Sequence, residues 1–241
     1  MRQLTIIGGG SSIKEGLALG LWDFLKDKYT FGCNYSYKYF VPTVQFFVDY
    51  KFWIDERMRM SHLPLIIGNF HRDILKDKPN NLHMFKQTAQ FDPTLKTGVY
   101  KSSLCGLFAL TMGIYLLGEG DIFLLGMDYG EVRKADAGNA SFTKGAEKDE
   151  KGNPITHFYQ GEILHRGIGK VSYYNDSGRV RKDYEPYLTV KNVKIYNVSP
   201  ISKIPEDIIP KISYDEFFKR LDYKIDQQEE RKAILDKLKS L

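Results

Sequence analysis

One stretch near the start of the chain decides the fold that we expect: Arg2-Gln3-Leu4-Thr5-Ile6-Ile7-Gly8-Gly9-Gly10-Ser11-Ser12-Ile13-Lys14-Glu15. Its apolar, β-branched run is typical of a strand that is buried on both faces. A glycine-rich turn and a helical pattern follow, and we expect Ser11 or Ser12 to cap the helix. This order can cradle a phosphate, because backbone N–H groups and the positive end of a helix approach one point. A tight turn without a ligand is the alternative interpretation.

Composition limits the classes of protein that the chain fits. Its 241 residues suffice for a full core without disulfides, and 35 Lys and Arg against 30 Asp and Glu leave a net charge of +5. This mild excess fits an anionic ligand and is too small to indicate nucleic acid. Cys33 and Cys105 lie in apolar surroundings without metal-ligand spacing, so we expect buried free thiols in a reducing compartment.

No signal peptide is visible, since the N-terminus runs directly into the first apolar run. The most apolar stretch, Leu104 to Leu117, is too short to span a bilayer comfortably and predicts a buried helix. We therefore expect a cytoplasmic protein with at most peripheral membrane contact.

The pattern of elements predicts an α/β fold. Five further strands are expected at Tyr29 to Asn34, Val44 to Asp49, Leu63 to Ile67, Asp121 to Tyr129 and Lys194 to Ser199. A helix is predicted from Thr97, as N-cap, to Leu117, and an amphipathic helix with one break from Tyr214 to Leu241. The segment between Phe70 and Pro93 is expected to be a loop. Strands that alternate with helices predict a Rossmann-like, mainly parallel sheet with helices on both faces.

We expect three parts: a nucleotide-binding α/β core over residues 1–129, a lid-like excursion after the fifth strand over 130–192, and a last strand and C-terminal helix over 193–241 that complete the core. The excursion is polar and lacks periodicity, which is typical of a functional lid or a disordered loop. It contains three candidate reactive residues, which are His157, Tyr159 and His165. We expect the histidines to be acid–base or phosphate-contact residues, with ordinary surface histidines as the alternative.

Polar residues end several of the predicted strands: Asn34, Asp49, Asp128 and Ser199. Because the carboxyl ends of parallel strands share one edge, we expect these residues to meet the glycine loop and the Thr97-Gly98 helix start in a nucleotide site. Asn34 offers a donor and an acceptor to a sugar or base, or else forms a turn. Asp128 is a candidate reactive carboxylate, or else it caps a turn. The nicotinamide-binding pattern is broken at Ile13 and Asn34, and no P-loop motif and no Asp-x-Asp pair is present.

Five short stretches carry a resemblance to a known family: Ile6–Ile13, Phe31–Asn34, Thr97–Tyr100, Ile122–Tyr129 and Ser199–Pro200. In order, they resemble a Gly-Asn-Gly-Pro-Ser-Leu loop, an Arg-Cys-Asn strand, a Ser-Gly-Val-Tyr helix start, a strand ending in Gly-Ile-Asp-Phe and a Cys-Pro turn. These belong to the bacterial CMP-sialic-acid-dependent sialyltransferases of the lipooligosaccharide type. Their distant relatives include archaeal hydroxymethyl-dihydropterin diphosphokinases.

The resemblance implies a glycosyltransferase that uses a CMP-sugar and a glycan acceptor and needs no metal cofactor. It implies that the glycine loop, Asn34 and Thr97 contact the cytidine nucleotide and that His157 is the base. Our full set of catalytic candidates is His157, His165, Asp128 and Tyr159. The binding candidates are Gly8, Gly9, Gly10, Ser11, Ser12, Asn34, Thr97, Gly98 and Ser199. The family's Arg before Ser-Gly-Val-Tyr falls at Leu95, and the Tyr after Gly-Ile-Asp-Phe falls at Gly130.

Two other functions fit the same residues. One is a diphosphokinase acting on a pterin-like alcohol, with Asp49 and Asp128 holding Mg²⁺ against ATP. The other is a non-catalytic nucleotide-binding protein of a phage or mobile element. Among macromolecular partners we expect no nucleic acid, and a homo-oligomer could form through the C-terminal helix.

Overall fold

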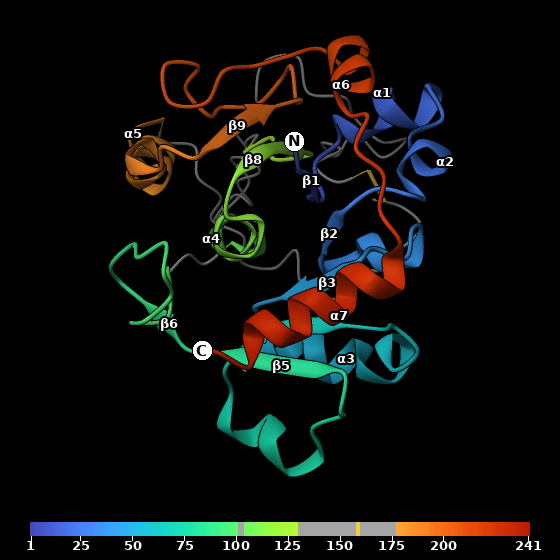
Figure 1. Ribbon diagram of the computed structural model, residues 1–241, viewed down its shortest axis with the longest axis vertical. Coiled ribbons are helices and arrows are strands. Elements are labelled where there is room, and N and C mark those ends of the chain that lie inside the picture. Colours follow the sequence, from blue (N-terminus) through green and yellow to red (C-terminus); the bar gives the residue numbers. More distant parts are fainter. Residues whose placement is uncertain (101–103, 130–157, 160–176) are drawn as a thin grey trace, which may run out of the picture.

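The computed structural model describes residues 1–100, 104–129, 158–159 and 177–241 (Figure 1). These residues contain a seven-stranded sheet in which every neighbouring pair is parallel. In spatial order its strands are β5 (Leu82–Phe85), β4 (Ile66–Asn69), β3 (Val44–Phe47), β2 (Thr30–Cys33), β1 (Gln3–Ile7), β8 (Gly120–Leu125) and β9 (Val193–Asn197). Two short strands, β6 (Gln87–Thr88) and β7 (Val99–Tyr100), pair separately. The predicted α/β, Rossmann-like fold is confirmed.

The order of the strands reverses beside β1. From β1 the chain adds β2 to β5 on one side, and later adds β8 and β9 on the other. The boundary between β1 and β8 is therefore a topological switch point, where open α/β sheets bind ligands at their carboxyl edge.

Helices cover both faces of the sheet. On one face lies α4 (Cys105–Leu117), and on the other lie α1 (Ile13–Ala18), α2 (Leu21–Leu25), α3 (Tyr50–Met60) and α6 (Tyr214–Arg220) (Figure 1). The other helices of the described residues are α5 (Ser177–Tyr184), α7 (Gln227–Leu238) and the 3-10 turns η1 (Asn34–Lys38), η2 (Arg72–Asp77) and η5 (Glu185–Thr189).

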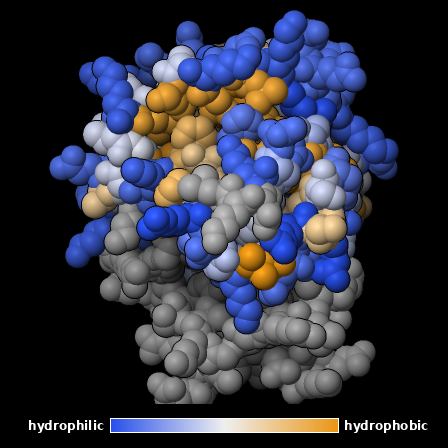
Figure 2. Space-filling view, turned by 90° about the horizontal axis from the view of Figure 1, so that it is seen from below, coloured by the Kyte–Doolittle hydropathy of each residue, from blue (hydrophilic) through white to orange (hydrophobic). Residues whose placement is uncertain are grey.

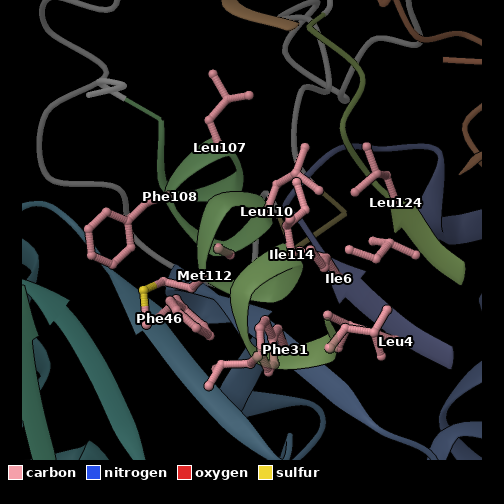
Figure 3. Packing of buried hydrophobic residues seen from close by; sticks show 14 of the residues in the cluster. Leu4, Ile6, Phe31, Phe46, Leu107, Phe108, Leu110, Met112, Ile114 and Leu124 are labelled. Atoms are coloured by element: carbon pink, nitrogen blue, oxygen red, sulfur yellow. The ribbon is translucent and has the colours of Figure 1, made fainter. Parts of the chain in front are cut away.

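Alternation of side chains along each strand builds the two cores. Leu4 and Ile6 of β1 pack toward α4, whereas Ile7 joins the opposite cluster with Ile13 and Leu21. Figure 3 shows α4 above the strands, with Met112 of the helix beside Phe46 of β3 and Leu107 on the side turned away from the strands. Nearly every residue of α4 is buried, as its apolar character all round predicts.

The C-terminal helix α7 lies across the amino edge of the sheet and supplies partners for backbone carbonyls before β3 and at the end of α4 (Figure 1). Arg231 Nε donates to the Thr43 carbonyl at 3.1 Å, and Lys237 Nζ donates to the Leu116 carbonyl at 2.8 Å. The apolar side chains Ile234 and Leu238 are buried against the same chain. The predicted covering role of this helix is thus visible within a single chain.

Among the described residues on the face seen in Figure 2, most are hydrophilic, and hydrophobic ones gather in one larger and one smaller patch. Among the described residues, no helix combines the length and apolar character needed to cross a membrane. Both cysteines are free and buried, as predicted. A hydrogen bond with Cys105, together with burial, raises the pKa of the Cys33 thiol.

The start of the predicted helix at Thr97 is wrong. α4 begins at Cys105, and its N-cap position is held by Leu104, which has no polar side chain to cap the helix. Gly98 has a φ of 114°, and Val99 N–H donates to the Lys86 carbonyl at 2.9 Å, so Thr97 and Gly98 form a turn that leads into β7. Pairing with the segment after β5 therefore replaces the helix that local sequence favours.

Of two other predicted segments, one differs from the structure and one agrees with it. The segment between Phe70 and Pro93 was expected to be a loop, yet it contains β5, an edge strand in which only Leu82 is fully buried. The break expected in the C-terminal helix is confirmed, because α6 ends at Arg220 and α7 begins at Gln227 with its own cap. That cap is Asp226, whose carboxylate accepts from Gln228 N–H at 2.8 Å and Glu229 N–H at 3.0 Å.

Two buried tyrosines allow a matched test of the core. Tyr187 OH donates to the Leu107 carbonyl at 3.2 Å and lies 2.9 Å from Thr111 Oγ1, whereas Tyr214 OH has no hydrogen-bond partner among the described residues. We expect Tyr187→Phe to lower the free energy of unfolding by about 1 kcal/mol and Tyr214→Phe to change it by less than about 0.5 kcal/mol. Urea denaturation of both variants measures this difference, and equal losses would contradict the assignment.

Buried phenols also predict a loss of stability in alkali. Burial raises the pKa of Tyr29, Tyr184, Tyr187 and Tyr214 above the ordinary value of about 10. Above that pH the unfolded chain releases these protons while the folded chain keeps them, so the free energy of unfolding falls. Urea denaturation between pH 8 and 11 should show a decline that starts near pH 10. A constant value up to pH 11 would contradict it.

Candidate functional site

The carboxyl edge at the switch point brings four predicted segments together. β1 lies between β2 and β8, with Ile7 opposite both Gly32 and Leu125, and Leu124 lies opposite Asn197 of β9. The residues that follow these strands therefore share one edge: the Gly8–Ser12 loop, Asn34, Asp128 and Ser199. The structure thus groups most of the predicted binding residues, although they are distant in sequence.

The glycine loop is held against the end of β8. Gly8 N–H donates to the Leu125 carbonyl at 2.7 Å, and Gly10 N–H donates to the Gly126 carbonyl at 2.9 Å. A Cβ at Gly8 would lie 2.5 Å from the Gly126 oxygen, and one at Gly10 would lie 2.3 Å from Asp128 Oδ2. The two loops approach so closely that both positions require glycine. The N–H groups of Gly8 and Gly10 donate to β8 and its following turn, so they are not directed at an anion as the sequence suggested.

Gly9 and Ser11 differ from Gly8 and Gly10 in the use of their N–H groups. The Gly9 carbonyl accepts from Phe158 N–H at 3.0 Å. None of the hydrogen bonds among the described residues uses the N–H of Gly9 or Ser11. Any anion bound by the loop would be held by these two N–H groups. The dipole of α1 contributes little, because this helix has only six residues.

Asp128 links the loops that follow β1, β8 and β9. It is buried, and its Oδ2 accepts from Ser12 N–H at 2.9 Å. Its Oδ1 accepts from Ser12 Oγ at 2.5 Å and also from Ser199 Oγ. Of the two cap candidates, Ser11 and Ser12, Ser12 occupies the N-cap position of α1, but its hydroxyl donates to Asp128 and makes no capping bond. This geometry favours a structural role for the Asp128 carboxylate, which was one of the two interpretations of that residue.

Asn34 stands at the end of β2 with a φ of 50°, in the left-handed region. Its carbonyl accepts from Gln45 Nε2 at 2.8 Å. The residue is half-buried, and its carboxamide makes no hydrogen bond with any other described residue. The carboxamide can therefore offer its donors and acceptor to a ligand at this edge.

Tyr159, a predicted catalytic residue, lies in an aromatic cluster beside the loop. It is only 2% exposed, and its ring centroid lies 5.5 Å from that of Tyr35 and 4.9 Å from that of Phe158. The ring centroid of Phe158 also lies 5.9 Å from that of Trp22. The predicted histidines, His157 and His165, lie outside the described residues.

Thr97 and Gly98 are not brought to the glycine loop by any described contact. Their turn is fixed beside Lys86, which follows β5, and β5 is four strands away from β1 in the sheet. The N-terminus of α4 occupies the place expected for them, because a Cβ at Gly106 would lie 2.4 Å from Met127 Sδ at the end of β8. The predicted contact of Thr97 with a nucleotide therefore loses its geometric basis.

The two carboxylates proposed for Mg²⁺ are also separated. Asp49 is exposed and caps α3, with Oδ1 accepting from Lys51 N–H at 2.8 Å. It follows β3, whereas Asp128 follows β8, and β2 and β1 lie between these strands. Three steps of about 4.8 Å put the two strands roughly 14 Å apart, far beyond the span of one ion with Mg–O bonds of about 2.1 Å. No cluster of three or more His, Cys, Asp or Glu suited to a metal occurs in the described part of the chain.

Sequence reasoning missed one residue of this region, Gln45. Its buried side chain is hydrogen-bonded to Asn34, and its only sequence signal is a polar residue inside the apolar run Val44–Phe47.

Comparisons with known proteins assign neither a family nor a function to this chain. No family model matches the chain, and neither the curated proteins nor the solved structures provide a match.

Proposed function

We propose that this chain is a nucleotide-sugar-dependent glycosyltransferase of the sialyltransferase-like kind, which uses a CMP-sugar donor. One observation carries the proposal. The glycine loop and Asn34 lie side by side at the carboxyl edge of a parallel sheet, next to its topological switch point. Open α/β sheets bind nucleotides at this position.

The nucleotide half of the proposal rests on polar groups of the described residues. The N–H groups of Gly9 and Ser11 are suited to donate to a phosphate, and the Asn34 carboxamide is suited to a ribose or base. The net charge of +5 also fits an anionic ligand.

The sugar-transfer half rests on the resemblance of the sequence motifs. In this reaction the bond from the sugar to the CMP phosphate breaks, and a base takes the proton from the acceptor hydroxyl as that oxygen bonds to the sugar. We propose His157 as the base. The next residue, Phe158, donates its N–H to the Gly9 carbonyl, so the chain meets the glycine loop one position after His157.

Two measurements test the proposal. Addition of CMP or CDP should raise the melting temperature, and CMP should be released from CMP-sialic acid faster when a glycan acceptor is present. No thermal shift combined with no release would overturn the proposal. Release that is unchanged in His157→Ala would remove that residue from its role.

The alternatives give other results in the same assays. Mg²⁺-dependent conversion of ATP to AMP would indicate a diphosphokinase, although Asp49 and Asp128 do not meet around one ion. A thermal shift with CMP but no release under any condition would indicate a nucleotide-binding protein without catalysis.

A further inference from the structure

A buried glutamine, Gln45, lies beside Asn34 at the carboxyl edge of the sheet, where we propose that the nucleotide binds. Gln45 on β3 has no exposed surface, and its Nε2 donates to the Asn34 carbonyl at 2.8 Å and to the Phe46 carbonyl at 3.0 Å. Its Oε1 accepts from Ser36 Oγ at 3.5 Å. Both donor positions of the amide are therefore used, and one of them holds Asn34, the residue that follows β2.

The neighbouring residues fit this amide. A Cβ at Gly32 would lie 2.5 Å from Ser36 Oγ and 2.9 Å from Gln45 Oε1, so glycine at 32 leaves room for the glutamine side chain. Asn34 has a φ of 50°, a conformation that Asn tolerates better than most residues and that still has an energetic cost. The hydrogen bond from a buried donor helps to keep Asn34 in this conformation.

We infer that Gln45 is a positioning residue for the ligand site. By binding the Asn34 carbonyl it fixes the left-handed backbone, and with it the direction in which the half-buried Asn34 carboxamide leaves the chain. That carboxamide contacts the ribose or base of the ligand, so Gln45 sets affinity without touching the ligand. This inference rests on the proposed nucleotide site.

The test is a double-mutant cycle in CMP affinity. Gln45→Met keeps the size of the side chain and removes both donors, whereas Asn34→Gly allows the left-handed backbone and removes the carboxamide. We expect each single variant to weaken CMP binding about tenfold. Because both changes remove one contact, the double variant should bind no more weakly than either single variant. Gln45→Leu, which removes both donors and the acceptor, provides a second variant that should also weaken binding about tenfold.

Gln227→Met is the matched control. Gln227 makes similar bonds at the opposite edge of the sheet, with Nε2 donating to the Lys28 carbonyl at 2.9 Å and Oε1 accepting from Thr43 Oγ1 at 2.9 Å. It should lower stability and leave CMP affinity unchanged. A purely structural Gln45 would behave in the same way.

The outcomes separate this inference from the proposed function. Wild-type affinity in Gln45→Met, or losses that add in the double variant, would overturn the inference alone. A crystal structure of Gln45→Met in which Asn34 keeps its φ and side-chain direction would also overturn it. A wild-type chain that binds no CMP would overturn the proposed function together with the role of Gln45 in affinity, while that crystal structure would still test its hold on the Asn34 backbone.

Discussion

Replacing Asp128 with alanine is expected to lower the free energy of unfolding by about 3 kcal/mol, measured by urea denaturation. The carboxylate accepts from Ser12 N–H, Ser12 Oγ and Ser199 Oγ. Asp128 and both serines are buried. Hydrogen bonds to a charged group contribute about 1.5–3 kcal/mol each, and buried donors left without an acceptor add a desolvation cost. The loops after β1 and β9 would lose their common anchor.

Asp49→Ala is the control for this variant. Asp49 is also a strand-end aspartate, but it is exposed and accepts one bond, from Lys51 N–H. Loss of such a helix cap should lower the free energy of unfolding by about 1 kcal/mol. Equal losses in Asp49→Ala and Asp128→Ala would contradict the anchoring role of Asp128.

Gly8→Ala is expected to have the next largest effect, a loss of about 2–3 kcal/mol in the free energy of unfolding. Its Cβ would lie 2.5 Å from the Gly126 oxygen and 3.1 Å from the Leu125 oxygen. Both are backbone atoms at the end of β8, which pairs with β1, so relief of the clash would cost the Gly8 N–H bond to Leu125. CMP affinity should fall as well, because the loop that begins at Gly8 would move.

Gly106→Ala supplies the matched comparison. Its Cβ would also meet a neighbour closely, at 2.4 Å, but that neighbour is the Met127 sulfur at the end of a flexible side chain. Alanine also favours the helix by about 1 kcal/mol over glycine. We expect a change within about 1 kcal/mol, measured by the same urea denaturation. A loss in Gly106→Ala equal to that in Gly8→Ala would contradict the account of the glycine loop.

The fold was predictable because its central strands are strongly apolar. Leu4 to Ile7 and Ile122 to Leu125 are buried on both faces, and such runs leave few alternatives to a parallel sheet. The edge strand β5 was missed because Leu82 is its only fully buried residue. The helix start at Thr97 was wrong because pairing between β6 and β7 overrides local capping preference, and that pairing is not visible in the sequence.

The site was predictable in its location and not in its hydrogen bonds. Polar residues at strand ends indicated the edge where the loop, Asn34, Asp128 and Ser199 meet. The sequence could not show that Gly8 and Gly10 donate to β8, since that depends on the register between two strands far apart in the chain. Gln45 was missed because one polar residue in an apolar run does not show which backbone group its side chain binds.

A backbone amide NMR titration with CMP tests the central claim most directly, because it reports on each N–H of the loop separately. The account predicts that CMP shifts the amide resonances of Gly9 and Ser11 and the side-chain amide of Asn34. The resonances of Gly8 and Gly10, which donate to the carbonyls at the end of β8, should shift least within the loop. Saturating CMP that leaves Gly9, Ser11 and Asn34 unchanged, or that shifts only residues at the amino edge around Gln227, would contradict it.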